Sequence, residues 1–110
     1  MSQAVIDVTD FERDVLETSS QVPVLVDFWA EWCTVCKGLS RTLEDMAEDS
    51  DGAFVLAKLN VETHPELAKQ YGVQSLPTVT LYRHGEVIDS FSGQLPKMHI
   101  RSFLSRHMTE

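Results

Sequence analysis

The 110-residue sequence has little of several features that mark specialised classes of protein. It has only two cysteines, Cys33 and Cys36, so a framework of several stapling disulfides is excluded. No apolar run approaches the ~18 residues of a membrane span, and the first ten residues lack the basic flank and apolar stretch of a secretory signal. We therefore expect a cytoplasmic protein with no membrane partner.

Positive charge is also scarce, because nine Lys and Arg residues stand against seventeen Asp and Glu residues, a net charge of −8. Nucleic acids and anionic membranes are bound mainly through Lys and Arg, so both are poor partners for this chain. Apolar residues make up 43% and charged residues 24% of the sequence, which argues against a disordered chain. Since there is no repeat and no linker-like stretch, we expect one domain over residues 1–110. We also expect the protein to be a monomer.

The apolar pattern alternates between strand-like and helix-like segments in the order βαβαβαββα. The expected strands cover residues 4–8, 22–30, 53–61, 78–82 and 86–91; the expected helices cover about 9–18, 34–49, 63–72 and a last stretch containing Ile100, Phe103, Leu104 and His107. Capping boxes are expected at Thr9 with Glu12 and at Thr63 with Glu66. Segments 22–30 and 53–61 are apolar on both faces, which predicts buried central strands of a three-layer α/β domain with its first strands parallel and its last antiparallel.

Cys33 and Cys36 follow the central strand at the start of the longest helix, where ligand chemistry in such sheets is found. A spacing of three on a first helical turn brings two cysteines within the ~5.5 Å Cα separation that a disulfide needs. Unpaired N–H groups at the helix start favour a thiolate on Cys33, whereas Cys36 lies one turn inside. We predict that Cys33 attacks and Cys36 resolves, and that the N–H of Val35 points toward the Cys33 sulfur.

Two other interpretations of the cysteine pair are half of a zinc site and two reduced cysteines that pack as small apolar side chains. A zinc site normally has four ligands, and the sequence has no second cysteine pair. The four histidines, His64, His84, His99 and His107, show no ligand-like spacing. A CxxC motif beside a βαβ pattern is typical of redox chemistry, which we favour over both alternatives; we expect no metal and no cofactor beyond a redox-active disulfide.

Asp27 and Lys58 are charged residues within the two most apolar strands. A buried charge is costly unless it is paired or neutralised, so we expect the two side chains to lie near each other. A structural ion pair is one explanation, and a part in the cysteine chemistry is another.

Several motifs are distributed along the chain: VDFWAEWC before the pair, CK closing it, KLNV in the next strand, YGVQSLPT and HGEV around the hairpin, and SGQLPK before the last helix. They carry a resemblance to the thioredoxin family over nearly the whole sequence. It implies the thioredoxin fold, a mixed five-stranded sheet flanked by four helices. It also implies a protein-disulfide reductase that exchanges a dithiol for a disulfide, with disulfide-containing client proteins and thioredoxin reductase as partners.

The resemblance also implies roles for individual residues. Asp27, with Lys58 beside it, would assist proton transfer to or from Cys36, and Pro77 would be cis and face the disulfide. We expect a substrate-binding rim formed by Trp32, Thr34, Val35, Val61, Val73, Leu76, Pro77 and Gly93. For each apolar member, an ordinary core or surface position is the alternative. Trp29 is expected to pack beneath the site, and Lys37 to be a solvated charge.

The sequence departs from the family pattern at two places. Thr34 and Val35 replace the usual Gly-Pro between the cysteines, and Arg41 replaces a proline that bends the second helix. The segments FVLAKLNVE and VIDSFSGQLP also resemble the thioredoxin domain of co-chaperedoxin. A module that holds client proteins through its apolar rim, with a secondary redox role, is therefore the alternative function.

Overall fold

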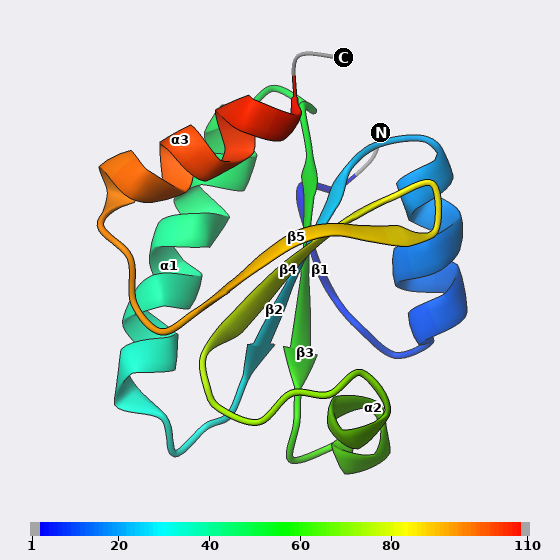
Figure 1. Cartoon of the computed structure of the whole chain (residues 1–110), viewed down its shortest axis with the longest axis vertical. Helices are drawn as coiled ribbons and strands as arrows, with labels where there is room; N and C mark the ends of the chain where they lie inside the picture. The colour runs from blue at the N-terminus through cyan, green and yellow to red at the C-terminus, as the bar shows by residue number, and fades with distance from the viewer. Residues whose placement is uncertain (1–2, 109–110) are drawn as a thin grey trace.

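A five-stranded sheet lies between two layers of helices in the computed structural model, which describes residues 3–108 (Figure 1). The strands are β1 (Val5–Asp7), β2 (Val24–Trp29), β3 (Val55–Asn60), β4 (Thr78–Arg83) and β5 (Glu86–Ser92), in the spatial order β1-β3-β2-β4-β5. β3 pairs in parallel with β1 and β2, whereas β4 runs antiparallel to β2 and β5. The predicted three-layer α/β architecture is confirmed.

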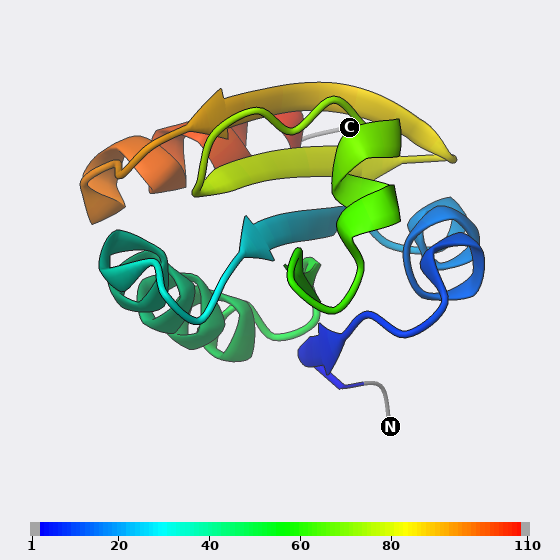
Figure 2. The ribbon, with the colours of Figure 1, turned by 90° about the horizontal axis from the view of Figure 1, so that it is seen from below.

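The helices cover both faces of the sheet (Figure 2). They are η1 (Glu12–Glu17), which continues into η2 (Thr18–Ser20), then α1 (Thr34–Asp49), α2 (Pro65–Gln70) and α3 (Lys97–His107). α1 and α3 lie on one face, and the η1–η2 segment and α2 lie on the other (Figure 1). α1 has the bounds expected from its apolar spacing, because its buried positions recur at three- and four-residue steps.

Alternation along the central strands divides the core into two layers. Leu25 on β2 and Leu56 on β3 belong to the layer under α1 and α3, whereas Val26 and Ala57 belong to the layer under η1 and α2. Because side chains alternate between the faces of a strand, Asp27 and Lys58 lie on the same face as Leu25 and Leu56. The two charged residues of the central strands therefore face α1.

Both expected capping boxes are wrong in their partners. At η1 the carboxylate of Asp14 accepts from the backbone N–H groups of Thr9 and Asp10, at 2.9 and 3.1 Å, and Asp10 accepts from the N–H of Arg13. Asp10 takes the role expected of Thr9, because a carboxylate accepts more strongly than a hydroxyl, and Asp14 takes the role expected of Glu12.

The second box fails for a different reason. The helix begins at Pro65, so His64 occupies the cap position without a side-chain cap bond, and the Thr63 hydroxyl donates instead to the carbonyl of Asn60. Proline has no N–H and suits the first helical position, so it determines where α2 begins.

Candidate active site

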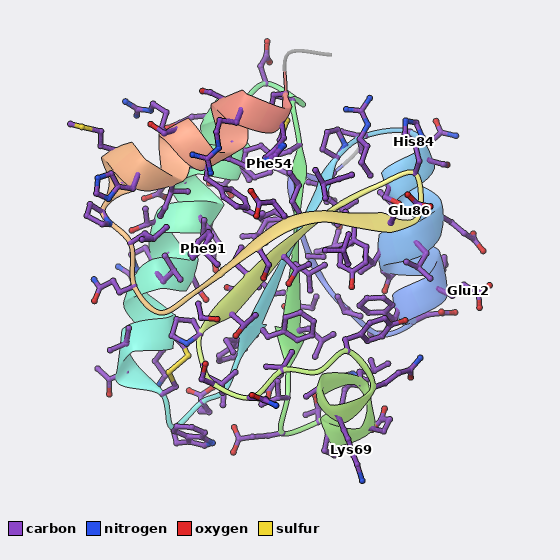
Figure 3. The ribbon with its side chains drawn as sticks, viewed as in Figure 1. Glu12, Phe54, Lys69, His84, Glu86 and Phe91 are labelled. Carbon is purple, nitrogen blue, oxygen red and sulfur yellow. A yellow bond between two sulfur atoms is a disulfide. The ribbon has the colours of Figure 1, made fainter. Side chains whose placement is uncertain are left out.

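The turn between β2 and α1 positions the cysteine pair. β2 ends at Trp29, the N–H of Cys33 donates to the carbonyl of Ala30 at 3.1 Å, and Cys33 caps α1 in an extended conformation. Cys33 and Cys36 form a disulfide with a Cα–Cα distance of 5.2 Å, drawn as the yellow bond at the start of α1 in Figure 3. The short helical spacing therefore suffices to join them, as expected.

The two sulfur atoms have different surroundings. Cys36 has no exposed surface, whereas 8% of Cys33 is exposed. Cys33 Sγ accepts a hydrogen bond of 3.2 Å from the N–H of Cys36. In the disulfide form the donor is therefore Cys36 and not Val35, because the cap side chain reaches the third N–H of the helix rather than the second. A hydrogen bond from Val35 to the Cys33 thiolate of the reduced form stays a prediction.

Asp27, on the face of β2 that α1 covers, is fully buried. The Ser40 hydroxyl donates to its Oδ2, while Oδ1 has no hydrogen-bond partner within residues 3–108. Burial raises the pKa of Asp27 to about 6, against the opposing effects of the Ser40 hydrogen bond and the positive charge of Lys58. A carboxyl group with this pKa exchanges protons readily near neutral pH.

Lys58 is the register neighbour of Asp27, as expected, but its ion-pair partner is another residue. Its Nζ lies 2.8 Å from Oε2 of Glu44 and 4.9 Å from the ring centre of Trp29. Among the described residues Asp27 makes no ion pair, so a structural Asp27–Lys58 ion pair is wrong. Glu44 is half-buried and keeps part of its hydration, so pairing it with Lys58 costs less desolvation than burying the ammonium against Asp27.

A hollow of about 280 Å³ opens beside these groups. Its lining consists of one aromatic, one hydroxyl and five charged side chains: Trp29, Glu31, Lys37, Ser40, Arg41, Glu44 and Lys58. Lys37 is exposed and pairs with Glu31 at 3.1 Å, which agrees with its expected place as a solvated charge. Sequence reasoning missed Ser40 and Glu44, although both follow Cys36 at the four-residue spacing of one helix face.

The bond between Leu76 and Pro77 is cis, as the resemblance implies, and Pro77 is buried. The N–H of Gly93 donates to the Pro77 carbonyl at 2.8 Å. Neither the N–H nor the carbonyl of Leu76 has a backbone or side-chain partner within residues 3–108. The N–H and carbonyl of Leu76 are therefore free to form hydrogen bonds with the main chain of an extended peptide segment.

The expected rim residues divide into two groups. A second hollow, of about 190 Å³, brings together four of them, Trp32, Val61, Val73 and Leu76, with Ala68, Gln74 and Ser75. Trp32 is 69% exposed, while Val61 and Leu76 pack against the cysteines together with Trp29. Thr34, Val35 and Gly93 do not line this hollow. Thr34 and Val35 are exposed on the first turn of α1.

Comparison with known proteins identifies the family to which this chain belongs. The model of the family described as Thioredoxin matches residues 2–106. The chain belongs to the thioredoxin family. It is 40% identical over 99 residues to the thioredoxin of Chlorobaculum thiosulfatiphilum, with 90% of each chain covered. It is 38% identical over 110 residues to the thioredoxin of Pseudomonas aeruginosa, covering 98% of this chain and all of the relative.

Family membership and the cysteine geometry together establish the chemistry. The protein is a thioredoxin-type thiol–disulfide oxidoreductase with protein-disulfide reductase activity, and its CxxC pair is Cys33 and Cys36. Proteins with disulfides are therefore its clients. Within the described part of the chain, no group of three or more His, Cys, Asp or Glu side chains is placed to hold a metal ion. No helix of residues 3–108 is long and apolar enough to span a membrane.

Proposed function

We propose that the oxidoreductase reduces client disulfides in two exchange steps, with Cys33 as the attacking and Cys36 as the resolving cysteine. The Cys33 thiolate attacks one client sulfur, a mixed disulfide forms, and the other client sulfur leaves as a thiolate. The Cys36 thiolate then attacks Cys33 Sγ, which forms the Cys33–Cys36 disulfide and releases the second client thiol. The difference in exposure between the two cysteine residues carries this assignment.

Asp27 accepts the proton that Cys36 must lose before it attacks. Cys36 and Ser40 are one helical turn apart on the buried face of α1, and Asp27 is bonded to Ser40. Its Oδ1 has no other partner among residues 3–108 and is available for the proton. Lys58, held by Glu44, contributes positive charge next to Asp27 and favours the carboxylate.

A client segment binds across the cysteines in extended form. Its main chain pairs with Leu76 next to Pro77, and its side chains contact the apolar rim. The rim consists of Trp32, Val35, Val61, Val73 and Leu76, with Thr34 and Gly93 at its margins. Burial of apolar surface supplies affinity without sequence specificity, which suits a reductase that acts on many clients.

The oxidised protein is returned to the dithiol form by a thioredoxin reductase in the cytoplasm. The protein acts as a monomer with one domain over residues 1–110. Its family, the pairing of its cysteines and the near-complete coverage of its relatives support this cycle.

The first test compares Cys33→Ser and Cys36→Ser in reduction of insulin disulfides, with and without thioredoxin reductase. We expect Cys33→Ser to abolish reduction, and Cys36→Ser to accumulate a mixed disulfide with insulin that mass spectrometry detects. Loss of the trapped species from Cys36→Ser, or its appearance on Cys36 of Cys33→Ser, would show that the assignment of attacker and resolver is wrong.

The alternative function is a client-binding module, and the exposure of Trp32 and Val35 favours it. Suppression of client aggregation distinguishes the two functions when it is measured on the same variants. If the protein is a binding module, Cys33→Ser still suppresses client aggregation fully and Trp32→Ala does not. If it is a reductase, Cys33→Ser no longer suppresses client aggregation.

A further inference from the structure

Ser40 is the polar member of an apolar helix face. The buried residues of α1 are Cys36, Leu39, Ser40, Leu43 and Ala47, and together they form the surface that packs on the sheet. Ser40 is 3% exposed. A buried hydroxyl without a hydrogen-bond partner destabilises a core, so the partner that Ser40 has is informative.

That partner is Asp27. The Ser40 hydroxyl donates to Oδ2, and it is the single hydrogen-bond partner of the Asp27 side chain within residues 3–108. Lys58, across the strand pair, is engaged by Glu44, and Glu44 itself places negative charge toward the carboxylate. Lys58 on β3 and Ser40 and Glu44 on α1 all face Asp27, and of these Ser40 is the one that holds the Asp27 carboxylate by direct contact.

The location of Ser40 joins two parts of the site. Ser40 follows Cys36 by four residues, so the two side chains are neighbours on one helix face. Ser40 also lines the hollow with Trp29 and Glu44. A hydrogen bond from this position occupies one carboxylate oxygen and leaves the other, Oδ1, without a protein partner among the described residues.

We propose that Ser40 is a positioning residue for disulfide exchange, which holds the Asp27 carboxylate in one orientation and stabilises its charged form while Oδ1 accepts the Cys36 proton. In this step the Cys36 S–H bond breaks, an Oδ1–H bond forms, and the electron pair stays on sulfur for its attack on Cys33. The inference rests on the proposed role of Asp27. A donor to the charged form favours the carboxylate, so Ser40 keeps the base available at lower pH.

The test follows the two steps separately in stopped flow, with the reduced protein and dithiobis(nitrobenzoate). The first nitrothiolate released reports attack by Cys33, and the second reports resolution by Cys36. Ser40→Ala should move the pH midpoint of the second release upward by about one unit and slow it about tenfold below that midpoint. The first release should change much less. Ser40→Thr keeps the hydroxyl and should restore the wild-type profile.

Two further measurements separate positioning from general damage. Urea unfolding verifies that Ser40→Ala and Ser40→Thr are folded, and the carboxyl resonance of Asp27, followed by NMR against pH, should titrate at higher pH in Ser40→Ala. In the Asp27→Asn background, adding Ser40→Ala should leave the second release unchanged, because the carboxylate through which Ser40 acts is absent.

Three results overturn the inference. The first is a slow second release in Asp27→Asn together with a wild-type pH profile in Ser40→Ala. This result would show that Asp27 takes part in resolution and that Ser40 does not. Equal slowing by Ser40→Ala with and without the Asp27 carboxylate shows a merely structural effect. An unaltered second release in Asp27→Asn removes the role of Asp27, and that of Ser40 with it.

Discussion

At the scale of single residues, the charge of Asp27 is held at a cost in stability. The carboxyl group is fully buried and has one hydrogen-bond partner within residues 3–108, and burial raises its pKa from 3.8 to about 6. A raised carboxyl pKa means that the folded state binds this proton more tightly than the unfolded chain. The free energy of unfolding therefore falls as pH rises from about 4 to 6, and the cost persists at neutral pH.

Asp27→Asn should consequently stabilise the oxidised protein at neutral pH. The displacement from 3.8 to about 6 corresponds to about 2 to 3 kcal/mol, and the difference from wild type should shrink toward zero below pH ~4. Urea unfolding at about pH 7, 5 and 4 measures it. A difference that grows on acidification would have the wrong sign for a raised pKa.

The two cysteines should differ in reactivity once reduced. Cys33 has the greater exposure and sits at the start of α1, whereas Cys36 is enclosed. We expect iodoacetamide to modify Cys33 faster than Cys36 by about tenfold or more, because thiolate content and access both favour it. Mass spectrometry of partly alkylated protein gives the ratio. Equal rates would mean that helix-start geometry does not separate the two thiols.

At the scale of elements, α1 is continuous from Thr34 to Asp49 although it contains a glycine, and it lacks the family's proline. Arg41 stands where that proline is expected, and its side chain lines the hollow that Ser40 and Lys58 also line. A proline within a helix removes a backbone hydrogen bond and introduces a kink, so Arg41 permits an uninterrupted helix. Gly38 remains as the residue of α1 with the lowest helix propensity.

Gly38→Ala should stabilise the protein by about 0.5 to 1 kcal/mol. A Cβ at this exposed position meets no atom within 4 Å, so the change acts through the backbone alone. Gly85→Ala is the matched control: its Cβ also meets open space, but the hairpin holds Gly85 at φ +78°. A left-handed conformation costs an L residue about 1 kcal/mol, so this change should destabilise. Urea unfolding of both variants should give shifts of opposite sign.

At the scale of the whole molecule, charge opposes the association of two copies of the chain. The Cα radius of gyration of 12.6 Å is close to the ~13 Å expected of one compact folded domain of this length. The net charge of −8 repels a second copy. The edge strand β5 exposes Val87 and Ile88, but it also carries Glu86 and Asp89, and charges on an edge oppose pairing with another strand.

Small-angle scattering should therefore report a monomer of 12.4 kDa. A concentration series at low salt and again at about 0.15 M salt is needed, because charge repulsion is largely screened beyond ~8 Å at the higher value. The expected result is one mass and one radius under both conditions. A mass near twice this value at the higher salt would show that two chains associate once repulsion is reduced.

Much of the fold follows from local pattern. The apolar spacing of residues 34–49 predicts the bounds of α1, and His84-Gly85 predicts the hairpin between β4 and β5, where both residues adopt positive φ. These features depend on residues close together in the chain, whose periodicity and turn preferences are visible in one sequence. The position of Cys33 and Cys36 on one helical turn follows for the same reason.

Other features depend on which side chains the packing of α1 on the sheet brings together. The charges of Asp27 and Lys58 in apolar strands predict that each needs a partner, but only the tertiary structure assigns Ser40 to Asp27 and Glu44 to Lys58. The same packing forms the hollow beside them. A buried charge takes whichever partner is within reach at the lowest cost of desolvation, and both reach and desolvation are properties of the folded chain.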